Sequence, residues 1–373
     1  MEAYFDNSAT TKALDSVRDI MVKTLTEDFG NPSAKHTKGM EAENYIRQAA
    51  ADIAKTLKVK DKEILFTSGG TESNNMALIG TALANQRAGK HIISTRIEHA
   101  SVYQPLAFLE SLGFEVTYLH VDHNGHISLE ELEQSIRPDT ILVSVMYVNN
   151  EIGAIEPIDE IARLVHGKNP KIVFHVDAIQ AYGKLVIRPK KQGIDLLSVS
   201  AHKFHGPKGV GAAYIRGDDY GLPPMSAFMH GGEQEHGLRA GTLAVHNIVG
   251  FGKAAELAIA NEQRQIACIQ KLEQTAKKII ASNEHLELLG DSEHHLPGVI
   301  SLIVNLEDFD NERFVKRISA KFAVSTGSAC TAGMPSHVLQ AIGKGDAVSR
   351  VLRISLSAEN TIDQVEAFLK ELS

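Results

Sequence analysis

A lysine flanked by two hydrogen-bonding residues follows a short, apolar stretch of the chain. The run Ser200-Ala201-His202-Lys203 comes directly after Asp195–Val199 (DLLSV), which is typical of a buried strand. A lysine amine can form an imine with a carbonyl compound when burial or a neighbouring cation lowers its pKa. The side chains of Ser200 and His202 could both donate to a phosphate. Taken alone, this motif is read more simply as a surface lysine on a loop.

An acidic residue ends a second strand-like segment. Asp177 follows Ile172–Val176 (IVFHV), and Gln180 lies three residues later in the same turn. Ligands of doubly wound sheets bind outside the carboxyl ends of the strands. If the ligand contains a pyridine ring, the Asp177 carboxylate can pair with its protonated nitrogen, and the Gln180 amide can reach a hydroxyl group on the ring. Asp177 could equally cap a helix.

A Gly-Gly turn offers a site for an anion. The run Ser68-Gly69-Gly70-Thr71-Glu72 follows the strand-like Glu63–Thr67 (EILFT) and opens a helical pattern. Glycines let the backbone approach an anion, and free N–H groups at a helix start favour a phosphate. A plain strand-to-helix turn is the alternative, so the motif is weak evidence by itself.

Polar residues follow two further strand-like segments. His99 comes after His91–Thr95 (HIIST), and Asn149 and Asn150 come after Ile141–Met146 (ILVSVM). An imidazole can stack on a pyridine ring and move protons, although a single histidine is more often structural. A lysine for an aldehyde, a carboxylate for a ring nitrogen and a cradle for a phosphate together predict pyridoxal phosphate as cofactor.

The elements that must position these residues alternate along the first two thirds of the chain. Two more strand-like runs are Glu115–Leu119 and Val210–Ile215, and helical patterns cover Glu72–Arg87 and Val102–Leu112. Several strands are apolar on both faces, as in a sheet covered by helices on both sides. This pattern predicts an α/β fold with a mainly parallel, doubly wound sheet of seven strands.

The last third of the chain has a different pattern. A long helix is expected from about Ala254 to Ser282, followed by strands at Val299–Val304 and Leu352–Leu356. We therefore expect a large cofactor-binding domain over residues 16–255. A smaller α+β domain would comprise residues 1–15 and 256–373, including Cys330, with the long helix joining the two.

Composition excludes several classes of protein. The chain has 373 residues, a net charge of -8 and only two cysteines, Cys268 and Cys330. These features argue against a nucleic-acid surface and a disulfide framework, and they favour a reducing cytoplasm. The sequence shows neither an apolar stretch long enough to span a membrane nor a secretory signal, so we expect neither membrane insertion nor export. The spacing of His202 and His205 could suggest a metal, but no further ligands lie nearby, so no metal site is expected.

At this point nine segments resemble one family in order and over nearly the whole chain, from Tyr4 to about Leu369. The family is that of the cysteine desulfurases of the NifS and IscS type. These belong to the class V aminotransferase group and have the PLP-dependent transferase fold of type I. The segments are YFDNSATT, FGNPSAKH, FTSGGTESNN, EHASV, VNNEIGAI, HVDAIQ, SAHKFHGPKGVGA, HGGEQEHGLRAGT and STGSACTAG.

The resemblance implies a role for each matching residue. Lys203 would carry pyridoxal phosphate as a Schiff base, and His99 would stack on the ring and act as acid and base. The remaining cofactor contacts would come from Gly70, Thr71, Asn150, Asp177, Gln180, Ser200 and His202, joined by Thr242 of a second subunit in a homodimer. Asn150 and Arg353 would bind the substrate carboxylate, a task that suits the planar fork of an arginine. Without the family, Arg353 would be read as a strand-surface residue.

Cys330 matches the nucleophile of the family and lies in a run of small residues, Ser325–Thr331. Its thiolate would take sulfur from L-cysteine, leaving L-alanine and a persulfide. The persulfide would pass to an acceptor protein, either an iron–sulfur scaffold or a tRNA-thiolation enzyme. Cys268 lies in the long helix pattern and is expected to pack.

Two departures and two alternatives accompany this interpretation. The segment after Cys330 is about two residues shorter than in close relatives, and the longer C-terminal extension of some members is not seen before Ser373. Both bear on which acceptor docks. A selenocysteine lyase on the same scaffold is the main alternative function, and a non-catalytic binding protein is the other.

Overall fold

The computed structural model describes residues 3–219, 221–327 and 336–372. The strands are β1 (Ala3–Tyr4), β2 (Ile64–Thr67), β3 (His91–Thr95), β4 (Glu115–Leu119), β5 (Thr140–Met146), β6 (Val173–Asp177), β7 (Leu196–Ser200), β8 (Gly211–Ile215), β9 (Leu286–Leu289), β10 (Val299–Val304), β11 (Phe322–Ala323) and β12 (Val351–Ser355). The helices are α1 (Asp15–Thr26), α2 (Thr37–Leu57), α3 (Gly70–Asn75), α4 (Thr81–Asn85), α5 (Ala100–Ser111), α6 (Leu129–Ser135), α7 (Ile158–Lys168), α8 (Pro189–Gln192), α9 (Val245–Ala281), α10 (Asn311–Ile318), α11 (His337–Ala341) and α12 (Ile362–Leu369).

The larger sheet has seven strands in the order β2-β8-β7-β6-β5-β3-β4. Strands β7, β6, β5, β3 and β4 run parallel, and β8 is antiparallel to both of its neighbours. The predicted α/β class and the mainly parallel sheet are confirmed. Because the parallel strands share a direction, their carboxyl ends meet at one edge of the sheet.

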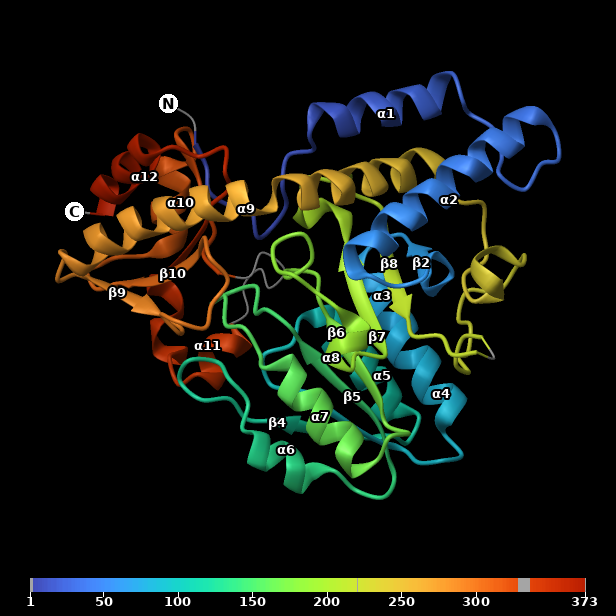
Figure 1. Cartoon of the computed structure of the whole chain (residues 1–373). Helices are drawn as coiled ribbons and strands as arrows, with labels where there is room; N and C mark the ends of the chain where they lie inside the picture. The colour runs from blue at the N-terminus through green and yellow to red at the C-terminus, as the bar shows by residue number, and fades with distance from the viewer. Residues whose placement is uncertain (1–2, 220, 328–335, 373) are drawn as a thin grey trace.

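Helices cover both faces of this sheet (Figure 1). Adjacent strand residues enter opposite cores, as the alternation of a strand requires. Phe66 and Ile93 belong to a core to which α2, α7 and the start of α9 also contribute, whereas Ile92 belongs to a core shared with α5 on the other face. The fully apolar strands seen in the sequence therefore reflect burial on two sides.

A smaller antiparallel sheet, β12-β10-β9, lies beside the first. Its core includes Phe5 from the N-terminal segment, Leu302 from β10 and Phe368 from α12. The long helix α9 contributes Phe251 to the core of the larger sheet and Ala276 to that of the smaller one. In Figure 1 this helix runs from one sheet to the other.

The predicted strands agree with the structure to within one residue at each end. Glu63, expected to start β2, instead belongs to a single 3₁₀ turn, where its buried carboxylate pairs with Lys190 at 2.9 Å. The helix expected from Glu72 starts at Gly70 and contains a π-helical turn, Met76–Gly80. The long helix begins at Val245 rather than Ala254, because Ile248 and Phe251 are core residues. Within the described residues, no helix combines the length and the apolar character that crossing a membrane requires.

Candidate active site

A cavity of about 270 Å³ lies at the carboxyl edge of the larger sheet. It is bordered by side chains from four parallel strands or the turns that follow them, by the N-terminal segment and by β12. The lining comprises Ser8, Ala9, Gly70, Thr71, His99, Ser101, Met146, Val148, Asn150, Asp177, Ile179, Gln180, Ser200, His202, Lys203 and Arg353. Nearly every residue singled out in the sequence for cofactor or substrate contacts is among them.

Lys203 lies in the 3₁₀ turn Ala201–Lys203, directly after β7. Its Nζ donates to the backbone carbonyls of Ser8 at 2.7 Å and Ala9 at 3.0 Å. The N-terminal segment thus passes over the end of β7 and fixes the amine at the cavity wall. Both of these acceptors are neutral backbone carbonyls.

Asp177 ends β6 and is almost fully buried. One carboxylate oxygen accepts from Asn74 Nδ2 at 2.8 Å and the other from the backbone N–H of Ile179 at 3.0 Å. Burial raises the pKa of Asp177, and these hydrogen bonds and the nearby His99 and Lys203 oppose that effect. A cation beside this carboxylate would therefore be strongly stabilised.

His99 is the N-cap of α5, and its Nδ1 accepts from the backbone N–H of Ser101 at 3.1 Å. That contact leaves the other ring nitrogen to carry the proton of the neutral ring. Burial lowers the pKa of His99, and the Lys203 ammonium adds to the effect while Asp177 opposes it. The imidazole is therefore neutral at pH 7 and can accept a proton.

The Gly-Gly turn lies beside Ser200 and His202. A Cβ on Gly70 would be 2.2 Å from Ile179 Cδ1, so a larger residue there would require the Ile179 side chain to move. Gly69 has φ of 154°, a conformation that other residues rarely adopt. Burial lowers the pKa of His202 to about 4, so its ring donates to an anion as a neutral group. Next to the Gly-Gly turn the cavity adjoins a second, more open pocket, whose lining includes Lys208.

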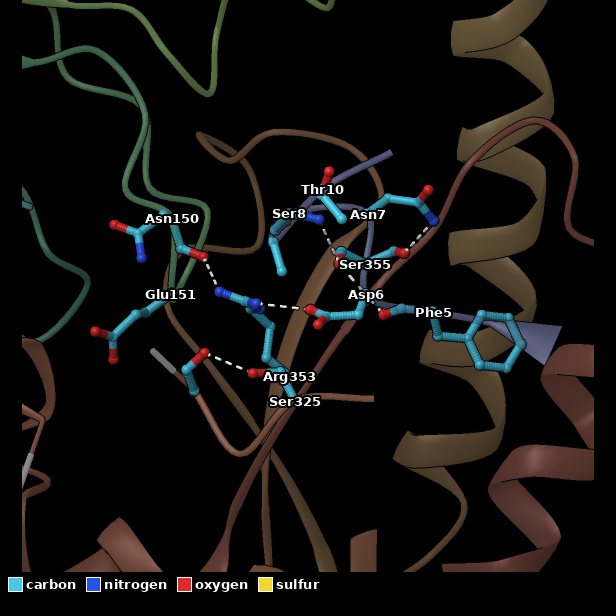
Figure 2. A network of polar contacts seen from close by, with 12 residues as sticks. Phe5, Asp6, Asn7, Ser8, Thr10, Asn150, Glu151, Ser325, Arg353 and Ser355 are labelled. Atoms are coloured by element: carbon cyan, nitrogen blue, oxygen red, sulfur yellow. Dashed lines mark hydrogen bonds and ion pairs between the residues drawn. The ribbon is translucent and has the colours of Figure 1, made fainter. Parts of the chain in front are cut away.

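Arg353 joins the smaller sheet to this cavity (Figure 2). Its side chain projects from β12 and is 2% exposed. Nη1 donates to the backbone carbonyl of Asn150 at 2.7 Å, and Nη2 pairs with Asp6 Oδ1 at 2.8 Å. Its Nε has no hydrogen-bond partner among the described residues. The guanidinium thus retains donors for a further acceptor in the cavity.

Two predicted residues are not brought together with the others. Thr242 is exposed and does not line the cavity of its own chain. Cys330 lies outside the described residues. The chain is anchored on either side of it: Ser325 exchanges backbone hydrogen bonds with Arg353, and Ser336 Oγ donates to Glu151 Oε2 at 2.6 Å.

Comparison with known proteins defines the family. Residues 3–368 match the model of the class-V aminotransferases. Over 373 residues the chain is 43% identical to the cysteine desulfurase IscS of Neisseria meningitidis serogroup C (strain 053442), covering 99% of this chain and 90% of that protein. The chain belongs to the cysteine desulfurases of the class-V aminotransferase family.

Solved structures of desulfurase type agree with the fold. A NifS-like protein superposes with a TM-score of 0.92 at 38% identity, over 100% of this chain and 98% of the other. A structure described as SspA in complex with cysteine gives a TM-score of 0.82 at 37% identity, over 96% of this chain and 99% of the other.

Cysteine desulfurases of this family depend on pyridoxal phosphate, and the cavity fits that group. A buried carboxylate, a Gly-Gly turn in which Gly69 has a positive φ and a lysine amine correspond to the ring nitrogen, phosphate and aldehyde of this cofactor. Among the described residues that line the cavity, Asp177 alone is acidic.

Sequence reasoning missed several groups that shape this site. Asn74 and Ser101 hold Asp177 and His99 in place, Asp6 holds Arg353, and the carbonyls of Ser8 and Ala9 hold Lys203. Asn74 carried a usable signal, since it lies one turn into the helix that the Gly-Gly turn opens. The carbonyls of the N-terminal segment carried none, because any residue type supplies a backbone carbonyl.

Proposed function

We propose that this chain removes sulfur from L-cysteine, yielding L-alanine and a persulfide on Cys330 that passes to an acceptor protein. One observation supports this most directly: Lys203, Asp177, His99 and Arg353 come from separate parts of the chain and line one cavity. A reactive amine, a buried carboxylate, a neutral imidazole and a carboxylate-binding guanidinium are the groups that cofactor-assisted amino-acid chemistry needs.

The residues proposed to hold pyridoxal phosphate divide by the part of the cofactor they would contact. Lys203 would bind through Nζ, Asp177 would face the ring nitrogen and Gln180 the ring oxygen, with Asn150 nearby. The phosphate would be held by Gly70, Thr71, Ser200 and His202 and by Thr242 of a second subunit. When bound, the cofactor supplies an electron sink that weakens bonds at the substrate's Cα.

Arg353 is proposed to orient the substrate. Its guanidinium can add a bidentate interaction with the α-carboxylate, and Asn150 supplies an amide next to it. Lys203 and His99 are the two bases that can move the Cα proton, since both are described at the cavity wall and His99 is neutral at pH 7. Uptake of that proton by one of them leaves the carbon skeleton ready to release sulfur.

The sulfur step requires Cys330 as a thiolate. Its sulfur attacks the substrate sulfur, forming an S–S bond as the Cβ–S bond breaks. The electron pair of the broken bond stays on the carbon skeleton, which takes up protons and leaves as L-alanine. Cysteine and the Cys330 thiol thus become alanine and a persulfide without an added oxidant.

Several finer points belong to the same proposal. The exposure of Thr242 supports a homodimer, because the residue can reach a phosphate only in another chain. The two hydrophobic cores support a division into residues 16–255 and residues 1–15 with 256–373. The low cysteine count supports a cytoplasmic setting. The acceptor would be an iron–sulfur scaffold or a tRNA-thiolation enzyme.

Substitution of Cys330 tests the function. We expect Cys330→Ala to keep the visible absorbance of the bound cofactor and to lose sulfide release from L-cysteine in the presence of a thiol reductant. Cys268→Ala is the matched control and retains activity, since Cys268 lies partly buried in α9. Unchanged sulfide release by Cys330→Ala would refute the persulfide step. A large kinetic preference for selenocysteine over cysteine would favour a selenocysteine lyase instead.

A further inference from the structure

A second cavity lies on the other side of Lys203. Its volume is about 250 Å³, and it shares Ser8 and Lys203 with the site described above. It extends from these residues to the middle of α9 and to the turn that follows β12. Its inner end is therefore next to the catalytic lysine, although none of the groups assigned to the phosphate or to the substrate carboxylate lines it.

The walls of this rear cavity are mostly apolar. Leu257, Ile266 and Ile269 of α9 face Leu296 and Leu356 from the smaller unit. The described residues of its lining include neither aspartate nor glutamate, and they include two lysines, Lys184 and Lys203. An apolar chamber with cationic groups and no acid is complementary to an anion that has an apolar body.

Lys184 lines this cavity, and its side chain is half-buried. Its ammonium group has three donors, and the described contacts give it one acceptor, Gln180 Oε1 at 3.1 Å. No carboxylate pairs with it among the described residues, although an ammonium that is partly withdrawn from solvent is normally paired. The charged groups that act on it are Lys203 and Arg353, both cationic, and burial together with them lowers the pKa of Lys184 to about 7.

We infer that the rear cavity is a binding site for a small monocarboxylate with an apolar body, anchored by its carboxylate on Lys184. The carboxylate meets the two unused donors of the ammonium, and the hydrocarbon lies against the leucine and isoleucine side chains. An uncharged ligand of the same shape makes the apolar contacts but leaves the ammonium unpaired. The site should therefore bind the carboxylate more tightly than the uncharged ligand.

Occupancy of this site would be felt at the reaction centre. Lys184 holds Gln180 Oε1, Gln180 Nε2 donates to the carbonyl of Ser8 at 2.9 Å, and Lys203 donates to the same carbonyl at 2.7 Å. A carboxylate on Lys184 therefore perturbs the group that holds the catalytic amine. The inference itself does not depend on which reaction the neighbouring cavity performs.

Hexanoate and hexanamide are matched probes, since they differ in the carboxylate alone. Isothermal titration calorimetry of the cofactor-loaded enzyme at pH 6.5 should show saturable binding of hexanoate and at least tenfold weaker binding of hexanamide. The preference for hexanoate falls about tenfold per pH unit above 7, because the neutral amine of unliganded Lys184 must then take up a proton on binding. Equal affinity for the two probes would overturn the inference.

Three variants test the charged anchor and the apolar wall of this cavity separately. Lys184→Met should lose the preference for hexanoate, and Lys191→Met, the same change on an exposed lysine of α8, should keep it. Ala258→Met fills the cavity from α9 without touching Lys184 and should weaken both probes at least tenfold, which guards against misfolding of Lys184→Met. Retained preference in Lys184→Met would refute the anchor. If L-alanine displaced hexanoate, hexanoate would be bound at Arg353 in the first cavity, and the inference would be wrong. If the chain does not carry out the proposed reaction, only this competition with L-alanine is affected.

Discussion

Asp6 and Arg353, from opposite ends of the chain, form an ion pair at 2.8 Å beside the substrate cavity (Figure 2). Arg353 is 2% exposed, so the carboxylate of Asp6 both neutralises it and fixes the plane of its guanidinium. We predict that Asp6→Asn raises KM for L-cysteine about tenfold, a loss of about 1.4 kcal/mol of substrate binding. The value of kcat should change less, because the proton-transfer groups are untouched. Steady-state kinetics of the variant and the unmodified enzyme checks this.

Asp15→Asn is the control for that change. Asp15 is exposed at the start of α1 and pairs with the exposed Arg18, so its removal should leave both kinetic constants unchanged. If Asp6→Asn had the same KM as the unmodified enzyme, Asp6 would not position Arg353.

Asp177 offers a test of the cofactor site. Removing one partner of a buried ion pair costs about 3 kcal/mol, which corresponds to a rate loss of about 100-fold or more. We expect Asp177→Asn to retain bound cofactor but to lose this much of kcat, because the ring nitrogen would lose the carboxylate proposed to face it. Asp195→Asn is the control. It removes a partly buried carboxylate just before β7, at the amino ends of the parallel strands and away from the cavity, so kcat should be unchanged. Comparable losses in both variants would indicate a stability effect.

His175 gives the sheet a measurable pH dependence. It is buried in β6 between Ser144 and Ser198, each within 2.9 Å, and burial lowers its pKa to about 3. Between its unfolded pKa of about 6.5 and the folded value, the unfolded chain binds a proton that the folded chain does not, so stability falls as the pH falls. From pH 7.5 to pH 5.5 we expect His175 to account for a loss of about 1.4 kcal/mol.

Urea unfolding of the unmodified chain and of His175→Gln at these two pH values measures that contribution. The variant should lack this part of the pH dependence, whatever its absolute stability. His285→Gln, at an exposed histidine beyond α9, should behave as the unmodified chain does. Identical pH slopes in the unmodified chain and His175→Gln would show that His175 is not the group responsible.

The proposed second-subunit contact predicts a coupling between oligomer and cofactor. A hydrogen bond to a charged phosphate contributes about 1.5–3 kcal/mol, so Thr242→Ala should weaken pyridoxal phosphate binding about tenfold or more. Absorbance titration of the apoenzyme measures this, and sedimentation should give twice the chain mass of 40.6 kDa. A monomer that binds the cofactor as tightly as the unmodified enzyme would rule out a contribution from Thr242.

Strand periodicity made most of the fold predictable. The strand ends that present Asp177, His99 and Lys203 follow from apolar runs of sheet length, and their common edge follows from the parallel order. The start of α9 was placed too late because the residues before Ala254 include Gly250 and Gly252, which weaken a helical pattern. Gly252 is needed there, since a Cβ would be 2.7 Å from the backbone of Ala49.

The contacts between distant segments could not be predicted in the same way. Ser8 and Ala9 meet Lys203 through backbone carbonyls, and Asp6 meets Arg353 across the whole length of the chain. No local pattern singles out Lys184, because the cavity that it lines is completed by α9 and the smaller unit. Local patterns specify elements, whereas these pairings depend on how the two cores pack.

The helix α9 belongs to both hydrophobic cores, and this has a consequence for how the molecule comes apart. Its 37 residues form one uninterrupted stretch of about 56 Å. If α9 unfolds, apolar surface is exposed in both cores, so the unfolding of one core is thermodynamically linked to the unfolding of the other. Heating should therefore give one cooperative transition instead of two, and fragments cut within α9 should each lack the partner surface that completes their interior.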